Sequence, residues 1–373
     1  MAFFASLPPE LVEEIVELAL PPFSPSGWKG RARTLKALCM TCKQTMPAAR
    51  RLLYREMVVG SFAAIVDLAA RFSSQSSLPP VAFLRIEQTR VCNLSLWGGH
   101  ASVAGDVVAG QVVEKTKARV VTLVGWSGSD LSGMQGVQSL SFVDSRLQAW
   151  NLGSQRSKPV FASLHRLHFH DVDFDSLYDV DFDSLYDVLT SDAFPNLVSL
   201  ALASCYVTRE GDSQGSAWSD SPPLCDPVYL TKEYVPLLPQ LRAAAVVDST
   251  GFGKSGAFEV LEILHAYTVE YIYRRLPRCL RVLRLQAEQY WPLEPKQVLS
   301  LLTLADLPVL SELHLVSFAL DKVTVSGDFA AVEEWCQEKQ VTLFLSPMDD
   351  LDSFTPSFWR FLDGVKDRLG LDV

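Results

Sequence analysis

The run of residues closest to a catalytic motif is Asp248-Ser249-Thr250-Gly251-Phe252-Gly253-Lys254-Ser255. It follows the apolar segment 244–247 and precedes 257–273, which has helical spacing, and a phosphate-binding loop has this context. In such a loop, backbone N–H groups and the lysine surround the phosphates of a nucleotide. Asp248 stands where the first glycine is needed, so its carboxylate would lie close to those phosphates. One hypothesis is a nucleotide-dependent enzyme, and the other is a turn between repeated strands.

Three histidines and two cysteines could bind a metal ion. Cys39 and Cys42 form a single C-x-x-C pair on an apolar helix face, and no second pair completes a zinc site. His165, His168 and His170 cluster, and on a strand His168 and His170 share one face. A metal site needs further ligands that the sequence does not place beside them. We expect no metal, and we expect the histidines to line a binding surface.

An eight-residue segment is duplicated in tandem, because 172–179 is repeated as 180–187. Eight residues turn a helix by about 800° and leave a phase error of about 80°. Both copies therefore cannot present their apolar residues to one core. We expect one copy to pack as a helix through Phe182, Leu185 and Leu189, and the other to extend the preceding loop.

Aspartates in this duplicated segment resemble the start of a calcium-binding loop. Asp171, Asp173 and Asp175 match the first three ligand positions, but Ser176 replaces the glycine and Phe182 replaces the final glutamate. No His-Glu-x-x-His motif occurs in the sequence, and a Gly-x-Ser-x-Gly spacing occurs at 211–215, within a segment rich in Ser, Gly, Asp and Pro. We therefore expect a protein that is not an enzyme and that uses no cofactor.

The composition favours a folded protein of the cell interior. Of the 373 residues, 48% are hydrophobic and 20% are charged, which is enough apolar material for a large core. The net charge of −10 disfavours binding to nucleic acid, since it would repel phosphates. Seven scattered cysteines fit reduced core thiols, and no apolar run approaches the ~18 residues of a membrane span. We expect a cytoplasmic or nuclear protein that binds neither nucleic acid nor membrane.

The first sixty residues predict three short helices. Ser6, Pro8 and Glu10 are the cap, the first-turn proline and the acid that are typical of a helix start. The apolar residues recur at helical spacing in each helix: Leu7, Leu11, Ile15 and Leu18, then Leu35, Leu38, Cys39 and Cys42, then Leu52, Leu53 and Tyr54. A core of this size is marginal alone, so a partner or a neighbouring domain should complete it.

Three pieces of this segment occur in the order found in one adaptor-binding family. They are Leu7-Pro8-Pro9-Glu10-Leu11-x-x-x-Ile15, Leu35-x-x-Leu38-x-x-x-Cys42-Lys43 and Arg51-Leu52-Leu53-Tyr54-Arg55. Together they resemble an F-box of the fungal type. The resemblance implies that residues 1–60 bind a Skp adaptor, and thereby a cullin ligase scaffold, through Leu7, Pro8, Leu11, Ile15, Leu38, Cys42, Leu53 and Tyr54. The alternative is a helical cap that buries its own leucines.

Residues 61–373 repeat the spacing apolar-x-x-apolar-x-apolar. The middle residues of the copies are Leu84, Leu123, Leu140, Leu167, Leu200, Ala244, Leu283 and Leu313, and 341–345 is a last expected strand. The later copies are 33, 44, 39, 30 and 30 residues apart, which leaves room for helices at 61–72, 257–273 and 330–339. Leu197-x-x-Leu200-x-Leu202-x-x-Cys205 resembles the cysteine-type leucine-rich repeat that often follows an F-box.

The predicted fold is α/β: an F-box-like module followed by an irregular leucine-rich-repeat solenoid with a parallel sheet. The alternative is an ordinary α/β domain, whose buried parallel strands also form apolar runs. The segment 208–227 is rich in Ser, Gly, Asp and Pro and predicts a mobile insertion. Strand alternation places nine residues on the concave face: Arg85, Glu87, Arg166, His168, His170, Arg284, Gln286, Glu312 and His314.

These features together predict a substrate-recognition subunit of a Skp–cullin–F-box ubiquitin ligase. The helices would bind the adaptor, and the concave face of the array would bind a target protein. Mixed charges on that face favour a protein or peptide ligand over a polyanion. The alternative is a leucine-rich-repeat scaffold for protein interaction that has no ligase role.

Overall fold

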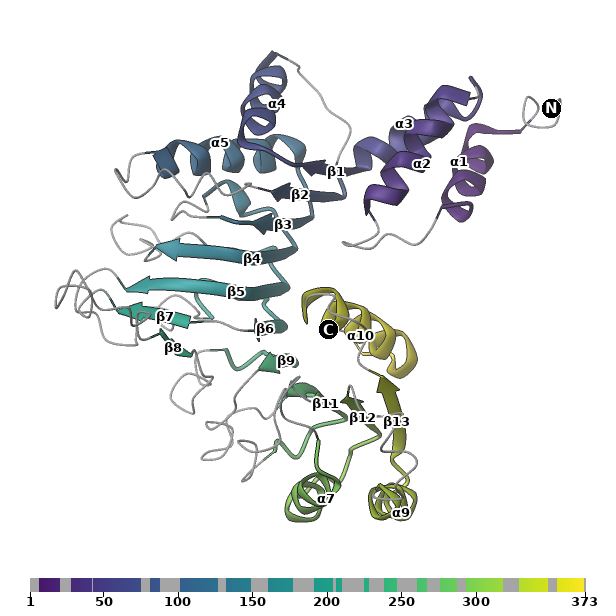
Figure 1. Ribbon diagram of the computed structural model, residues 1–373, viewed down its shortest axis with the longest axis vertical. Helices are drawn as coiled ribbons and strands as arrows, with labels where there is room; N and C mark the ends of the chain where they lie inside the picture. Colours follow the sequence, from purple (N-terminus) through teal and green to yellow (C-terminus); the bar gives the residue numbers. More distant parts are fainter. Residues whose placement is uncertain are drawn as a thin grey trace, which may run out of the picture.

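The N-terminal residues fold into three helices, α1 (Pro9–Leu18), α2 (Trp28–Thr41) and α3 (Met46–Arg55). They are seen at one end of the computed structural model in Figure 1. The structure describes residues 7–20, 28–41, 43–74, 81–87, 101–126, 132–148, 160–176, 191–203, 206–209, 225–227, 238–246, 260–266, 276–286, 293–317, 329–347 and 354–371. The helices enclose a small core of Val12, Val16, Leu20, Leu35, Ala48, Ala49 and Leu52. The chain passes from α3 directly into the first strand of a sheet, so the sheet adjoins this small core as a neighbouring domain.

One sheet contains the strands that the structure describes, and eleven of them are parallel and adjacent in chain order. They are β1 (Glu56–Val59), β2 (Phe83–Glu87), β3 (Val120–Val124), β4 (Ser139–Gln148), β5 (Arg166–Ser176), β6 (Ser199–Ala203), β9 (Ala243–Val246), β10 (Ile263–Ala266), β11 (Val282–Gln286), β12 (Glu312–Ser317) and β13 (Thr342–Pro347). A short strand, β7 (Tyr206–Arg209), pairs with β5 in parallel and with β8 (Cys225–Pro227) in antiparallel fashion. The fold is mixed α/β, as predicted.

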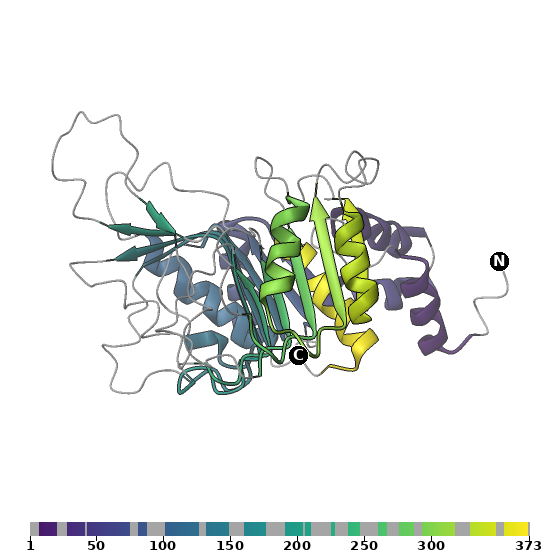
Figure 2. The same cartoon turned by 90° about the horizontal axis from the view of Figure 1, so that it is seen from below.

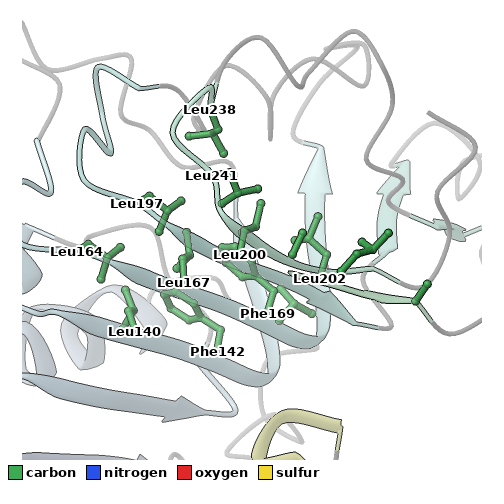
Figure 3. Packing of buried hydrophobic residues seen from close by; sticks show 14 of the residues in the cluster. Leu140, Phe142, Leu164, Leu167, Phe169, Leu197, Leu200, Leu202, Leu238 and Leu241 are labelled. Carbon is green, nitrogen blue, oxygen red and sulfur yellow. The ribbon is translucent and has the colours of Figure 1, made fainter. Parts of the chain in front are cut away.

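The apolar anchors predicted from the sequence lie in register across this sheet. Leu167 of β5 is paired with Leu140 of β4 and with Leu200 of β6. Two positions further on, Phe169 is paired with Phe142, and the ring centroids of this stacked pair are 5.5 Å apart. All five side chains are buried and belong to one continuous core, part of which is drawn in Figure 3. The repeated spacing therefore corresponds to a repeated position in the sheet.

A short turn before each of several strands lengthens the repeated unit. The N–H of Leu197 donates to the carbonyl of Phe194 at 3.2 Å. The same bond joins Leu164 to Phe161, Leu241 to Leu238, Leu280 to Pro277 and Leu310 to Leu307. Neighbouring turns are also linked, since Asn196 Nδ2 donates to the Ala162 carbonyl at 2.7 Å and Gln240 Nε2 donates to the Phe194 carbonyl at 2.9 Å. Each unit thus contacts its predecessor through both its strand and its turn.

Helices cover the two faces of the sheet unequally. The face that carries the apolar anchors, the outer face, packs against α4 (Phe62–Ser74), α5 (Ala101–Thr116), α7 (Pro295–Leu304) and α9 (Ala330–Lys339). The opposite face, the inner face, packs against α10 (Phe354–Leu369). Figures 1 and 2 show the sheet bending around α10, with α7 and α9 on the outside of the bend. The expected helices at 61–72 and 330–339 are confirmed as α4 and α9.

The helix expected at 257–273 is wrong, because β10 occupies the middle of that segment. All four residues of β10 are buried, so its apolar run lacks the alternation that distinguishes a strand from a helix. Leu264 of β10 lies in register between Ala244 of β9 and Leu283 of β11. The apparent gap of 39 residues in the repeat therefore contained one further copy.

The duplicated segment and the insertion also differ from expectation. The first copy of the octet was expected in a loop, but its residues 172–176 form the end of β5. The predicted helical residues Phe182, Leu185 and Leu189 lie outside the described residues. The two ends of the insertion at 208–227 belong to β7 and β8, which pair with each other. This pair extends the sheet beyond β5.

Candidate functional site

Helix α1 presents apolar side chains on two of its faces. Val12 and Val16 are 4% and 3% exposed and face the core of the helical module. Leu11, Ile15 and Leu18 recur at steps of four and three, so they form a second apolar stripe, and they are 45%, 39% and 80% exposed. A helix that only caps a sheet would bury its leucines. The exposed stripe of α1 has the form of a surface for a partner.

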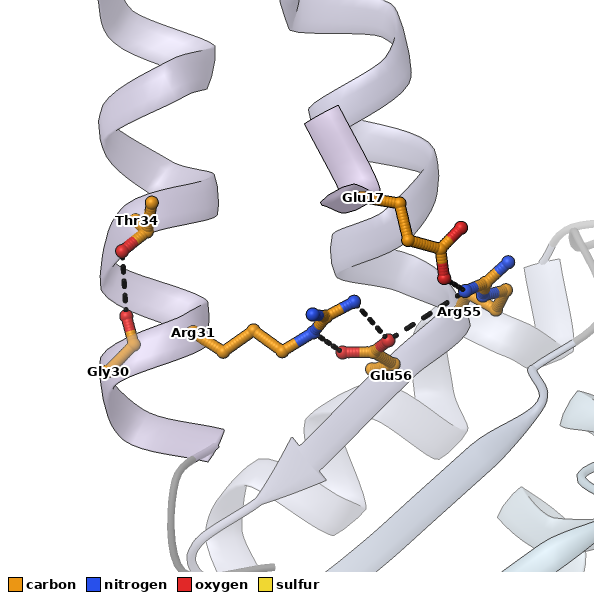
Figure 4. Close-up of polar contacts among 6 residues, drawn as sticks. All are labelled: Glu17, Gly30, Arg31, Thr34, Arg55 and Glu56. Atoms are coloured by element: carbon orange, nitrogen blue, oxygen red, sulfur yellow. Dashed lines mark hydrogen bonds and ion pairs between the residues drawn. The ribbon is translucent and has the colours of Figure 1, made fainter. Parts of the chain in front are cut away.

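Ion pairs hold α1 against α3 and join the helical module to the sheet. Glu13 of α1 lies 3.1 Å from Arg51 of α3, and Arg55 Nη2 donates to Glu17 Oε1. Arg31 of α2 donates to both oxygens of Glu56, the first residue of β1, at 2.8 and 3.0 Å (Figure 4). Arg31 is 4% exposed, so this two-point pair is the most protected of the three. The exposed stripe therefore belongs to a helix that ion pairs fix to α3, within a module that a further ion pair joins to the sheet.

The other predicted adaptor residues divide into two groups. Pro8 and Tyr54 are exposed. Leu7, Leu38 and Leu53 are half-buried and pack against the core of the module, so they support the exposed residues from below. Cys42, the eighth predicted residue, lies outside the described residues.

The predicted concave residues lie on the inner face of the sheet in continuous register rows. Pairing of neighbouring strands aligns His265 of β10 with Arg284 of β11, His314 of β12 and Phe344 of β13. The same row includes Arg85 of β2 and reaches His168 through β3 and β4. Sequence alternation thus predicts the placement of these side chains correctly for the strands.

Much of this face is covered by α10, which the sequence analysis did not identify. Phe358, Leu362 and Val365 of α10 are each 0% exposed, and they pack on alanines of β6 and β9 and on Ile263 and Val282. Their spacing of four and three is the signal that could have predicted the helix. Arg284, Glu312 and His314 contact α10 and are buried, and His168 and Gln286 on the same face are buried as well.

Polar and aromatic contacts join α10 to the predicted concave residues. Arg166 lies 2.8 Å from Asp363, and the Arg284 guanidinium lies 4.7 Å from the centroid of the Phe361 ring. The ring of His314 stacks on Phe344 at 4.3 Å and meets the edge of Phe361 at 5.0 Å. Glu312 accepts hydrogen bonds from Arg368 at 2.8 and 3.2 Å. Four of the predicted concave residues, Arg166, Arg284, Glu312 and His314, therefore contact a helix of the same chain.

Burial changes the protonation of the inner face. Burial lowers the pKa of His168, of His265 and of His314 below the usual value for histidine. Arg284 lowers the pKa of His265 further by charge repulsion. For Glu312, burial acts to raise the pKa, but hydrogen bonds from Arg368 and His314 outweigh it and lower the pKa. At neutral pH the face thus combines neutral imidazoles with an ionised carboxylate.

On the inner face near β2–β5, Arg166 contacts α10 through Asp363. Arg85 and Ser139 are half-buried there, and Val120 is 37% exposed. His170 is half-buried beside them on β5. Glu87 lies on β2 in the register row of Val124, and its side chain is outside the described residues. Arg166 belongs to this region and also contacts α10, so this region adjoins the part of the face that α10 covers.

The motifs that suggested chemistry find little support in the described residues. Residues 248–255 lie outside them, but the next described element is strand β10 and not the helix that a phosphate loop requires. Asp173 and Asp175 belong to β5, so they are not in the loop geometry of a calcium site. No group of three His, Cys, Asp or Glu side chains in the described ranges could hold a metal ion. Nor does any helix described there have the length and apolar character to cross a membrane.

No protein-family model matches the chain, and no curated protein matches it. Function must therefore be inferred from the two surfaces themselves, the exposed stripe of α1 and the inner face of the sheet.

Proposed function

We propose that the chain is a substrate-recognition subunit of a Skp–cullin–F-box type ubiquitin ligase, in which α1–α3 bind the Skp adaptor and the sheet binds a target protein. In this proposal the chain is not an enzyme. It works by position, because it holds the target close to the ubiquitin-charged enzyme that the cullin scaffold recruits.

The observation that carries the proposal is the exposed stripe of α1. Leu11 and Ile15 are the residues that the F-box resemblance assigns to the adaptor, and both are exposed although they are apolar. Exposing three large apolar side chains on one helix is unfavourable in water, at roughly 25 cal/mol per Å² of apolar surface. A partner that covers the stripe removes this penalty.

The arrangement of strands supports a leucine-rich-repeat-like solenoid. Parallel strands follow one another in chain order, and the anchor leucines are in register. Successive turns are also joined by side-chain hydrogen bonds such as that of Asn196 to the Ala162 carbonyl. Such a stack offers a continuous face of rigid strands to a target protein.

A binding experiment with a purified Skp adaptor tests the proposal. The full chain should retain the adaptor in a pull-down, and Leu11→Asp with Ile15→Asp should abolish retention, since two carboxylates would have to be desolvated in the interface. The matched control is Leu304→Asp with Val309→Asp, because both residues are exposed and apolar but lie far along the chain, at α7 and before β12. This control should bind like the wild type.

Two results would overturn the ligase proposal. One is the absence of adaptor binding by the intact, folded chain. The other is equal loss of binding in the α1 variant and in the control, which would indicate nonspecific contact. Either result would favour the alternative, a repeat scaffold that binds proteins without a ligase role.

A further inference from the structure

We propose that the inner-face groove under α10 binds an amphipathic helix of the target protein, and that α10 occupies this groove until the target helix displaces it. The α10 groove is defined by Ala201, Ala243, Ala245, Ile263, Val282, His265, Arg284, Glu312 and His314. The inference rests on the proposed receptor function and names the kind of target that the receptor takes.

The middle of the α10 groove has room for a helix because its strands carry small side chains. Ala201 of β6 and Ala243 and Ala245 of β9 are fully buried by α10. Alanines allow a helix to approach the strand backbone closely, so Phe358 and Leu362 pack deeply into the sheet. Because the strands pair with one another and not with α10, we expect them to keep this shape when the helix is absent, as helix-in-groove recognition requires.

One end of the α10 groove contains polar groups that fix the position of a helix. Glu312 accepts two hydrogen bonds from Arg368 and is also bonded to His314. One ring, that of Phe361, meets both the Arg284 guanidinium and the His314 ring. Buried polar pairs stabilise a fold less than apolar packing of the same volume does, so apolar contacts would hold a permanently bound helix better. They do specify register and partner.

The contacts of α10 allow it to leave without disturbing the sheet. It takes part in no strand pairing, so its release breaks no bond of the sheet ladder. The α10 side chains that form ion pairs with the sheet are accessible to water, since Asp363 is 57% and Arg368 is 46% exposed. As a tethered helix it competes at an effective concentration of the order of mM. A target helix must therefore match its chemistry to replace it.

The contacts of α10 define the expected target helix. It carries aromatic residues at the positions of Phe358 and Phe361, aliphatic residues at those of Leu362 and Val365, and an arginine at that of Arg368. The pattern is aromatic-x-x-aromatic-aliphatic-x-x-aliphatic-x-x-Arg. A helix of this kind satisfies the apolar middle and the polar end of the groove together.

A fluorescent peptide with the sequence of residues 354–371 tests the inference on the full chain. Phe361→Ala with Arg368→Ala in the chain weakens its own α10 but leaves the groove intact. Fluorescence anisotropy should show that the wild-type peptide binds this variant at least about tenfold more tightly than it binds the wild-type chain, a difference of about 1.4 kcal/mol. Adding Glu312→Gln to the variant should reverse the gain, because the groove itself then lacks its carboxylate.

Asp367→Ala is the matched control, since Asp367 is an exposed residue of α10, and this chain should bind the peptide like the wild type. Failure of the peptide to bind the Phe361/Arg368 variant overturns the inference. So does light scattering that shows a dimer of this variant in place of peptide binding, because the occupant would then be a second copy. Adaptor binding measured on the same samples reports on the ligase proposal separately.

Discussion

Glu312 of β12 and Arg368 of α10 form a two-point ion pair on the inner face of the sheet, with nitrogen–oxygen distances of 2.8 and 3.2 Å. The Glu312 side chain is 7% exposed and the Arg368 side chain is 46% exposed. The buried carboxylate is therefore balanced mainly by a charge on α10. This pair links the predicted binding surface to the helix that covers it.

Replacing Arg368 should loosen α10 selectively. Arg368→Ala leaves the Glu312 carboxylate with His314 as its hydrogen-bond partner and should reduce the free energy of α10 release by about 1–3 kcal/mol, toward the lower end because Arg368 is half-exposed. Amide hydrogen exchange of residues 358–369 measures this directly. Asp367→Ala should leave those rates unchanged. Unchanged rates in Arg368→Ala itself would show that the pair does not hold the helix.

The buried histidines should make the fold less stable in mild acid. Burial lowers the pKa of His168 and of His265, so the folded chain keeps them neutral while the unfolded chain takes up protons below about pH 6.5. Their contribution is complete above pH 6.5 and is lost as the pH falls from there toward the folded pKa, by up to about 1.4 kcal/mol per pH unit for each histidine. Urea unfolding at pH 7.5 and 5.5 measures the loss.

His168→Gln isolates this effect from other titrations. The loss of stability between pH 7.5 and 5.5 should be smaller in His168→Gln than in the wild type. His165→Gln should behave like the wild type, because His165 is exposed. A loss that is identical in all three chains would mean that His168 titrates normally in the folded state.

The pair between Arg31 and Glu56 should be essential for the helical module. Arg31→Met removes the main partner of Glu56, whose side chain is 10% exposed and whose next cation, on Arg55, is 3.9 Å away. Loss of one member of such a pair should lower the free energy of unfolding by about 3 kcal/mol. Arg33 is an exposed residue of α2, two positions after Arg31. Arg33→Met should change the free energy of unfolding by less than about 0.5 kcal/mol. Chemical denaturation measures the free energy of unfolding of both variants. Equal losses in the two would show that the pair between Arg31 and Glu56 does not stabilise the helical module.

Close backbone packing between α5 and the turn before β4 should not tolerate a side chain at Gly133. A Cβ atom at this position would lie 2.4 Å from the carbonyl oxygen of Gly110, so one backbone has to move. Gly133→Ala should therefore destabilise the protein by about 1–3 kcal/mol. Gly136→Ala is the control, since a Cβ atom there meets nothing within 4 Å. Thermal unfolding distinguishes them, and a Gly133→Ala chain as stable as this control would refute the close contact.

The repeated anchors were readable from the sequence because they obey strict geometry. Leu140, Leu167 and Leu200 each begin an apolar-x-apolar pair, because alternate residues of each strand face the same buried core. Strand β10 was misread because burial on both faces erased its alternation. The upstream turns, such as the one from Phe194 to Leu197, repeat an apolar-x-x-Leu spacing that would have revealed the missing copy.

The sequence predicted which residues lie on the inner face, but not that α10 covers them. Alternation placed Arg284, Glu312 and His314 on one face, yet it says nothing about which distant segment covers that face. Docking of α10 depends on side chains from β5 to β13 that come together only in the folded sheet. The same limit applies to α1, where Leu11 and Val12 are equally apolar and only packing decides which is buried.

Hydrogen exchange of the full chain with and without a purified Skp adaptor tests the central claim most directly. The proposed function predicts that the adaptor slows exchange in 9–18 and around Tyr54, and leaves β9 to β13 and α7 unchanged. A chain whose α1 amides exchange at the same rate with saturating adaptor, or in which protection arises only in the sheet, would contradict the assignment of α1–α3 as the adaptor-binding module.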